Sequence, residues 1–353
     1  MRRVLIAAGG TAGHVVPALA VADRLRAAGA DVVFVGGQRA EAQLVPAAGY
    51  ELRTIRVEGL SRTNPLRAAR AVVRAGAAVA AAHRILGELR PSVVLGGGGY
   101  VAGPVGLAAL LRRIPLVLTE ADSHLGVTNR LLAARARRVC LAFPIAGRDG
   151  PRYRVTGRPV PPPARDPVAA RQRFGLAPRE LCVLVFGGSL GARTINEAAV
   201  EAFEAAPFRV LHAAGERDHA ALAARIAGPH YDLRPYIDDF GDALAVCDLV
   251  VARAGGSIFE IAAAGKPAIL VPYPHASADH QSSNARWMAD AGAAVIVPDD
   301  ELTPARLGQE VGTLLGDPSR LATMAAASAA LARPQAAQDV ADEVLAAAEA
   351  RGS

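Results

Sequence analysis

Residues 3–14 read RVLIAAGGTAGH, in which an apolar run of strand length is followed by three glycines and then by a helix-like pattern. Such glycines either close a tight strand-to-helix turn or let the backbone approach a phosphate at a helix N-terminus. The pattern returns at residues 183–193, VLVFGGSLGAR, so a Gly-Gly-Thr/Ser-x-Gly loop stands at 9–13 and again at 187–191. This repetition at equivalent positions predicts two similar domains, each with a glycine loop after its first strand.

Strand-like apolar runs alternate with segments of helical periodicity along both halves of the chain. The runs of the first half are RVLIAA, DVVFVG, ELRTIRV, SVVLGG, PLVLTE and RVCLAF. Those of the second half are LCVLVFGG, FRVLHAAG, YDLRPYI, DLVVARAG, PAILVPYP and AAVIVPDD. The alternation predicts an α/β protein with two doubly wound, parallel, Rossmann-like domains. We expect the domains to face a cleft, because open α/β sheets bind ligands outside the carboxyl ends of their strands.

A proline-rich segment separates the two halves. Residues 156–167 read TGRPVPPPARDP, and five prolines lie within residues 159–168. Such a density of proline excludes regular structure and is typical of a fairly stiff linker. We therefore predict an N-terminal domain over residues 1–160 and a C-terminal domain over residues 161–335.

The composition excludes several classes of protein. With 353 residues and 52% apolar side chains, the chain can bury the cores of two domains. Its longest apolar run, VAGPVGLAALL, is stopped by Arg112 and Arg113 before it reaches the length of a membrane span. The start, MRRVLIAAGG, has an apolar part of strand length only, so we interpret it as a first strand and not as a signal peptide. The three cysteines have neither disulfide nor metal spacing, which fits a reducing cytoplasm.

The net charge of +6 conceals an asymmetry between the halves. Residues 1–165 hold 24 arginines against 9 acids, a balance of +15, whereas residues 166–353 hold 15 basic and 24 acidic side chains, a balance of −9. A basic half is suited to nucleic acid, an anionic membrane or a phosphorylated substrate. No finger spacing, aromatic sheet signature or basic–aromatic interleaving is present, so we expect no nucleic-acid partner.

The glycine loops do not fit the common nucleotide motifs. Neither main loop has the G-x-G-x-x-G spacing and ribose acid of dinucleotide binding, and the lysine of a P-loop is missing. A third cluster, LGGGGYVAGP at 95–104, follows another strand of the first half. Glycine is thus concentrated where the ligand cleft is expected. No paired carboxylates or Asp-x-Asp motif indicates a metal, and we expect no cofactor.

Three polar residues near the glycine segments are candidates for chemistry. His14 stands where a helix begins, so the helix dipole favours its neutral form and it can accept a proton; the alternative is a packing or capping role. Glu260 follows Gly-Gly-Ser by less than one turn and can accept two vicinal hydroxyls of a ribose; the alternative is a helix-dipole carboxylate. Gln281, in a polar loop, offers both a donor and an acceptor to sugar hydroxyls.

The motifs GGTAGHVVPALA, GGGGYVAGP, TEADSHLGVTNRLLA, GGSLGAR and RAGGSIFEIAAAGKPAILVPYPHASADHQSSNA occur in this order. Together they closely resemble the MurG family over essentially the whole chain. This is a family of peripheral-membrane glycosyltransferases that move N-acetylglucosamine from UDP-N-acetylglucosamine to undecaprenyl-diphospho-N-acetylmuramoyl-pentapeptide. The resemblance implies a GT-B fold, inversion at the anomeric carbon, and a donor site mostly in the C-terminal domain. It also implies that a final helix, at about 336–353, packs on the first domain.

The resemblance also assigns residues to roles. His14 matches the candidate base, Ser189 the serine at the donor phosphates, Ile237 the backbone contact to uracil, Glu260 the ribose-binding acid and Gln281 the sugar contact. The expected donor-binding set is Thr11, Ala12, Gly13, Asp122, Arg158, Ser189, Ile237, Gly256, Ser257, Ile258, Glu260 and Gln281. On the acceptor side the candidates are Gly98, Gly99, Tyr100 and Glu120.

Three stretches depart from the family pattern. In TEAD, Asp122 stands where the family has an asparagine that binds the donor. In GRPVP, Pro161 stands where the family has a phosphate-contacting arginine, and Arg158 or Arg165 is the candidate replacement. RAGGSIFE, at 253–260, is one residue shorter than the usual loop, so Gly256, Ser257 and Ile258 match only approximately.

A polyprenyl substrate implies a surface that reaches the membrane. SRTN is a good N-cap cluster, and Pro65 suits a first helical turn, so residues 66–90 are predicted to form a helix. A valine–leucine stripe facing the core, with solvated arginines opposite, explains most of its pattern. It leaves apolar residues among the arginines, as at an interfacial surface. The membrane-surface candidates are Leu66, Arg67, Arg70, Val73, Arg74 and Ile85.

We therefore expect a peripheral enzyme at the cytoplasmic face of the cell membrane, with an anionic membrane surface as a partner. The expected reaction is a single displacement by the acceptor's sugar hydroxyl. Two alternatives stay open: a hydrolysing UDP-N-acetylglucosamine 2-epimerase, and a non-catalytic protein that binds nucleotide sugars.

Overall fold

The computed structural model describes residues 2–57, 65–161, 164, 166–188, 191–276 and 279–350, with the backbone alone for residues 65–74. The chain divides into two compact units. The N-terminal unit comprises Met1–Val160 together with Arg333–Ser353, and the C-terminal unit comprises Pro161–Ala332.

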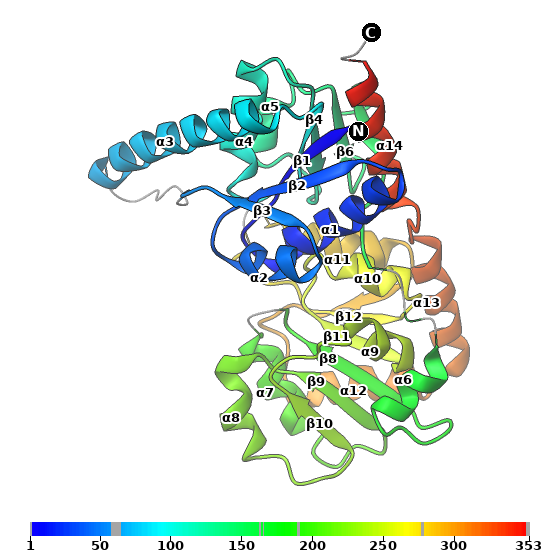
Figure 1. Ribbon diagram of the computed structural model, residues 1–353. Helices are drawn as coiled ribbons and strands as arrows, with labels where there is room; N and C mark the ends of the chain where they lie inside the picture. The colour runs from blue at the N-terminus through cyan, green and yellow to red at the C-terminus, as the bar shows by residue number, and fades with distance from the viewer. Residues whose placement is uncertain are drawn as a thin grey trace. The chain divides into compact units, whose positions relative to one another are not determined.

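The N-terminal unit is built on a seven-stranded sheet in which all neighbouring strands run parallel, in the order β3-β2-β1-β4-β5-β6-β7 (Figure 1). Its strands are β1 (Arg3–Ala7), β2 (Asp31–Gly36), β3 (Glu51–Thr54), β4 (Val93–Gly96), β5 (Leu116–Glu120), β6 (Arg138–Leu141) and β7 (Tyr153–Val155). The six strand-like runs predicted for this half are confirmed. The short edge strand β7 was not predicted, because its sequence, YRV, gives no clear strand pattern.

Helices cover both faces of this sheet. They are α1 (Ala12–Ala27), α2 (Ala40–Ala47), α3 (Pro65–Leu89), α4 (Ala102–Leu111), α5 (Val127–Leu132) and α14 (Ala336–Glu349). Along β1, Val4 and Ile6 pack in one core with α1 and α14, whereas Leu5 and Ala7 pack in a second core with α3, α4 and α5. Alternate residues of a strand point to opposite faces, so a strand buried on both faces is apolar throughout.

The C-terminal unit has a six-stranded parallel sheet in the order β10-β9-β8-β11-β12-β13. Its strands are β8 (Cys182–Phe186), β9 (Arg209–Ala213), β10 (Tyr231–Arg234), β11 (Leu249–Ala252), β12 (Ala268–Leu270) and β13 (Ala294–Ile296). They coincide with the six runs predicted for the second half. Both sheets carry helices on their two faces, so the predicted pair of doubly wound α/β domains is confirmed.

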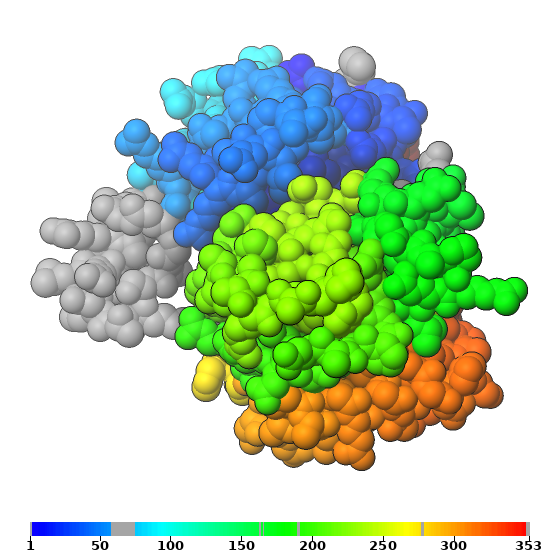
Figure 2. Space-filling model, turned by 90° about the horizontal axis from the view of Figure 1, so that it is seen from below, coloured from blue at the N-terminus to red at the C-terminus, as the bar shows by residue number. Residues whose placement is uncertain are grey.

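The helices of this unit are α6 (Pro167–Arg173), α7 (Arg193–Ala202), α8 (Glu216–Ala223), α9 (Phe240–Val246), α10 (Ile258–Ala263), α11 (His280–Asp290), α12 (Pro304–Leu315) and α13 (Pro318–Ala330). Figure 2 shows the surface of this unit, with its first helices in green and α12 and α13 in orange. Three of the helices begin with proline after a capping side chain: Asp166, Thr303 and Asp317 each accept a hydrogen bond from an N–H of the first turn. These caps define where the helices start.

In the described part of the chain, the helices are too short or too polar to cross a membrane.

Candidate active site

The glycine segments lie where the strand order of each sheet reverses. This happens between β1 and β4 in the N-terminal unit and between β8 and β11 in the C-terminal unit. The four strands are followed by Gly9–Gly10, Gly97–Gly99, Gly187–Gly188 and Gly255–Gly256. Open α/β sheets bind their ligands at such switch points, outside the carboxyl ends of the strands. The segments singled out from the sequence therefore mark the ligand edge of each unit.

His14 lies in the first turn of α1, against the glycine segment that follows β4. Its backbone N–H donates to the carbonyl oxygen of Thr11 (3.0 Å), and its Nδ1 lies 3.5 Å from Oγ1 of Thr11. At Gly98, where φ is +96°, a Cβ would lie only 2.7 Å from Cδ2 of His14. Glycine at this position thus leaves room for the imidazole ring. The structure brings His14 together with the candidates Thr11, Gly13 and Gly98.

The surroundings of His14 favour its neutral form. Burial, and then the Arg158 guanidinium, lower the pKa of His14 below its usual 6.5, against opposing effects of Asp122 and Glu41. A neutral imidazole near pH 7 is the state that a general base needs. Burial and the Arg158 guanidinium thus act in the direction that the helix dipole predicts from the sequence.

Arg158 reaches the first glycine loop from the far end of the N-terminal sheet. Its guanidinium donates a hydrogen bond to the carbonyl oxygen of Gly13. A cation is thereby placed beside the N-terminus of α1, next to His14. Of the two arginines named as replacements for the family's phosphate contact, Arg158 lies at the site, and Arg165 lies outside the described residues.

Glu120 braces its own loop. Its carboxylate accepts hydrogen bonds from the N–H of Asp122 (3.1 Å), the N–H of Gly126 (2.8 Å) and Nδ2 of Asn129 (2.9 Å). Burial raises the pKa of Glu120. The carboxylate therefore holds Asp122 in place. Asn129 was not singled out from the sequence, since a lone asparagine in a helical segment gives no signal of this contact.

In the C-terminal unit, the candidates surround the segment after β11. Glu260 lies half-buried in the first turn of α10. Ile258 is fully buried, and its N–H donates to the carbonyl oxygen of Gly255 (3.3 Å), so its side chain is not available to a ligand. Oε1 of Gln281 accepts from the N–H of Tyr273 (2.9 Å), which anchors this side chain beside the end of β12.

Of the remaining donor candidates, Ile237, Gly256 and Ser257 are among the described residues. Ile237 is buried, with 3% of the residue exposed. Gly256 and Ser257 form the turn before α10, where the N–H of Phe259 donates to the carbonyl oxygen of Gly256 (3.3 Å). Ser189 lies outside the described residues.

One membrane-surface prediction is wrong. Ile85 has 7% exposure and belongs to the core beneath α3. Ala78, Ala82 and Leu86 are also buried, and spacings of three and four residues place all of them with Ile85 on one helical stripe. The side chains of the other candidates, Leu66, Arg67, Arg70, Val73 and Arg74, lie outside the described residues.

Exposed aliphatic side chains instead occur on two neighbouring helices, α4 and α5. Leu107 and Leu111 of α4 are 43% and 63% exposed, and Val127 and Leu131 of α5 are 53% and 70% exposed. The two helices are in contact with each other. We call these four residues the α4–α5 patch. The sequence pattern does not reveal this patch, because both helices have apolar residues on several sides.

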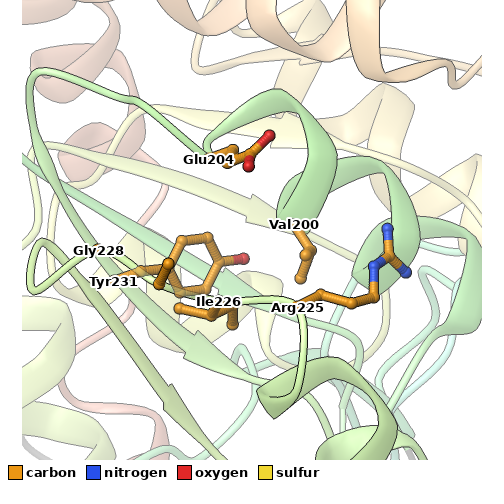
Figure 3. Close-up of a pocket in the computed structure, with 7 residues that line it drawn as sticks. Val200, Glu204, Arg225, Ile226, Gly228 and Tyr231 are labelled. Carbon is orange, nitrogen blue, oxygen red and sulfur yellow. The ribbon is translucent and has the colours of Figure 1, made fainter.

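A small pocket lies in the C-terminal unit between the end of α7 and the loop before β10 (Figure 3). Val200 and Glu204 line it on one side, and Arg225, Ile226 and Tyr231 on the other. Tyr231 is the first residue of β10, so the pocket is at the amino edge of the sheet. Because the glycine segments lie at the carboxyl edge, this pocket is not part of the candidate site.

Sequence comparison defines the class of protein. Residues 4–141 match the glycosyltransferase family 28 N-terminal domain, and residues 182–340 match the glycosyltransferase family 28 C-terminal domain. The two glycine-bearing units are thus the two domains of a glycosyltransferase, and the chain is a hexosyltransferase.

Individual relatives identify the family within this class of glycosyltransferases. UDP-N-acetylglucosamine--N-acetylmuramyl-(pentapeptide) pyrophosphoryl-undecaprenol N-acetylglucosamine transferase of Moorella thermoacetica is 43% identical, over 97% of this chain and 98% of the relative. The crystal structure of Acinetobacter baumannii MurG is 33% identical, with a TM-score of 0.77 over 98% of this chain and 100% of that one. The chain belongs to the MurG family, as the sequence resemblance predicted.

The same fold also occurs in proteins with much lower sequence identity. A UDP-N-acetylglucosamine 2-epimerase from Neisseria meningitidis has a TM-score of 0.70 over 98% of this chain and 100% of that one, at 14% identity. This likeness confirms the architecture and carries no information on the reaction. Family membership favours sugar transfer over the epimerase alternative.

Proposed function

We propose that this enzyme transfers N-acetylglucosamine from UDP-N-acetylglucosamine to undecaprenyl-diphospho-N-acetylmuramoyl-pentapeptide, a step of peptidoglycan synthesis. Family membership over almost the whole chain supports the reaction. The observation that carries the mechanism is the position of His14 at the switch point of the N-terminal unit, where burial and the Arg158 guanidinium favour its neutral form. The proposed acceptor side is therefore the N-terminal unit, and the proposed donor side is mainly the C-terminal unit.

The reaction is a single displacement with inversion. His14 takes the proton of the acceptor's sugar hydroxyl as the oxygen attacks the anomeric carbon, and UDP leaves with the bonding electron pair. A placed general base contributes roughly 10²–10⁴-fold to such a step. The Arg158 guanidinium next to His14 supplies a cation for the leaving diphosphate, which is the role of the arginine that Pro161 replaces.

On the donor side, Glu260 accepts the ribose hydroxyls and Gln281 contacts the sugar hydroxyls. The backbone of Ile237 is assigned to the uracil by the family match alone. In the N-terminal unit, the residues assigned to the donor by the family match are Thr11, Ala12, Gly13 and Asp122. Ser189, Gly256 and Ser257 are assigned to the donor by the family match alone, and Ile258 contributes through packing.

On the acceptor side, the enzyme binds peripherally to the cytoplasmic face of the membrane, because its acceptor carries a polyprenyl chain. Gly98, Gly99 and Tyr100 line the acceptor edge, and Glu120 shapes the loop beside it. The α4–α5 patch offers apolar side chains for an interfacial surface, and Arg130 is exposed on the same helix as Leu131. Aliphatic side chains among arginines suit an anionic bilayer.

A transfer assay with radiolabelled UDP-N-acetylglucosamine and a short-chain lipid acceptor tests the proposal. UDP release should require the acceptor. Glu260→Ala should raise the donor KM at least tenfold with little change in kcat, because a ribose contact stabilises the ground and transition states alike. Release of UDP without acceptor would favour the epimerase, and donor binding without turnover would favour a binding protein. Unchanged UDP affinity of Glu260→Ala would disprove its ribose contact.

A further inference from the structure

A buried carboxylate lies beneath the glycine segments of the N-terminal unit. Glu41, in the first turn of α2, has no exposed surface. Its Oε2 accepts a hydrogen bond from the N–H of Gly10, and its Oε1 accepts from the N–H of Gly37 and from the hydroxyl of Tyr100, each at 2.8 Å. One side chain thereby joins the segments that follow β1, β2 and β4.

These three strands are neighbours in the sheet, in the order β2-β1-β4, so Glu41 spans the switch point itself. The segments it joins are packed backbone to backbone: at Gly99, where φ is +76°, a Cβ would lie 1.9 Å from the carbonyl oxygen of Gly9. The ring of Tyr100 lies 3.6 Å from the Cβ position of Gly10. The same segment holds Gly98, against which the His14 ring packs.

The carboxylate is held in its ionised form. Burial by itself raises the pKa of Glu41, but the hydrogen bonds from Gly10, from its own backbone N–H, from Tyr100 and from Gly37 outweigh it and leave the pKa below its usual value. Burial, together with the bond to Glu41, raises the pKa of Tyr100 to about 12, so the hydroxyl keeps its proton as the donor. An acceptor with several charge-assisted hydrogen bonds is a rigid anchor, and removing it leaves buried donors unpaired.

We propose that Glu41 is a positioning residue of the transferase, which holds the segments after β1 and β4 so that His14 and the acceptor edge keep their reactive geometry. This inference rests on the proposed function of His14. Glu41 does not touch the reacting atoms, because Gly10 and Tyr100 separate it from the site. Its effect therefore falls on the rate of the chemical step and not on donor affinity.

The test compares Glu41→Gln with Tyr100→Phe. The glutamine keeps the shape but turns an NH₂ group toward a backbone N–H, and the phenylalanine removes a single hydrogen bond. Glu51→Gln is the matched control, because Glu51 also lies in the N-terminal unit but is exposed and paired with Arg53 (2.6 Å). At saturating substrates, kcat of Glu41→Gln should fall about tenfold to a hundredfold, as expected for a displaced catalytic group. The Kd for UDP and the donor KM should stay within about twofold, since the geometry of the site and not the donor contacts has changed.

Amide hydrogen exchange supplies a readout that does not depend on activity. In Glu41→Gln, peptides covering residues 9–14 and 97–104 should lose protection, although neither contains a residue of α2. Wild-type kcat together with unchanged exchange in these peptides would overturn the proposal while leaving the transferase function intact. If wild-type enzyme showed no transfer, the function would fail and the exchange data would still decide whether Glu41 holds the loops. Should Glu41→Gln not fold, Tyr100→Phe takes its place in the exchange measurement: unchanged protection of residues 9–14 and 97–104 would overturn the proposal, whereas its kcat is not used because Tyr100 itself lines the acceptor edge.

Discussion

His14 and Arg158 lie together at the first glycine loop. Pro161 stands where the family pattern predicts an arginine, and the guanidinium of Arg158 donates to the carbonyl oxygen of Gly13, one residue from His14. Burial, and then the same guanidinium, lower the pKa of His14. The proposed mechanism needs a neutral base and a cation for the diphosphate. The positive charge of Arg158 serves both needs, because it favours neutral His14 and supplies the cation.

The pH dependence of kcat/KM tests this pair, because this ratio reports the ionisation of the free enzyme. Neutral His14 is the active form, so kcat/KM should rise with pH through the pKa of His14 and reach a plateau, with the midpoint in the wild type below 6.5. Arg158→Gln removes the positive charge, so the midpoint should move to higher pH and the ratio of kcat/KM at pH 6 to kcat/KM at pH 8 should fall. His14→Ala should lower kcat about 10²-fold and abolish the acid limb. Arg148→Gln is the control, because the Arg148 guanidinium donates to the hydroxyl of Tyr153 in the edge strand β7 (3.3 Å). An acid limb that persists in His14→Ala would exclude His14 as the titrating base.

At the scale of elements, α14 is the clearest case of a distant segment that completes a core. Val340 and Val344 are fully buried with α1 and the N-terminal sheet. Glu343, 8% exposed, accepts hydrogen bonds from Arg138 of β6 and from Arg154 of β7 (2.6 Å). Burial acts to raise the pKa of Glu343, but the two arginines lower it below its usual value. The carboxylate therefore stabilises the attachment of α14 when it is ionised.

Glu343→Gln should destabilise the N-terminal unit at pH 7. Hydrogen bonds to charged groups contribute about 1.5–3 kcal/mol, and Tm changes by about 2–4 °C per kcal/mol in units of this size, so Tm should fall by several degrees. A folded-state pKa below the unfolded value means that this stability is lost as the pH falls through the folded pKa, so the variant and the wild type should converge in acid. Glu349→Gln, at the end of the same helix, should change Tm little, because its exposed carboxylate pairs with the exposed Arg2 that precedes β1. Scanning calorimetry at pH 7 and pH 3 measures both; a Tm difference that did not shrink in acid would contradict the linkage.

For the whole molecule, the distribution of charge and apolar surface bears on the membrane. The first 165 residues carry a balance of +15, and the rest carry −9. The α4–α5 patch is in the basic half, on helices that follow the acceptor-edge segments after β4 and β5. An enzyme whose acceptor is anchored in an anionic leaflet would therefore meet it with its basic half.

Vesicle co-sedimentation tests this orientation. The protein should bind anionic vesicles and be released by salt, since each basic residue near the leaflet contributes about 1 kcal/mol. Joint change of Arg67, Arg70 and Arg74 to Glu should abolish binding. Changing Leu111 and Leu131 together to Ser should weaken it at least tenfold, because burying a leucine side chain contributes about 1.5–3 kcal/mol. Val168→Ser is the control, since Val168 is 67% exposed but lies in the C-terminal unit. Binding that depended on neither salt nor lipid charge would refute the electrostatic contribution. If the leucine variant bound as tightly as the wild type, the α4–α5 patch would be excluded as a membrane contact.

The sequence by itself determined the architecture and the edge of each sheet where a site is expected. Strand and helix periodicities are local properties, and glycine loops after two corresponding strands mark the ends of parallel strands whatever packs around them. His14, Glu260 and Gln281 could be named as candidates in this way because each stands at a fixed offset from a loop or strand end. The motif order then identified the family, since it spans nearly the whole chain.

Only the tertiary structure decided which side chains support the site and which are buried. Glu41 looks like an ordinary helix-dipole carboxylate in its own segment, and its partners Gly10 and Tyr100 meet it only because the strand order places β1 between β2 and β4. Ile85 lies among arginines in sequence, yet it is buried because α3 turns that stripe toward the sheet. In both cases the outcome depends on contacts between residues far apart in the chain, which no local pattern encodes.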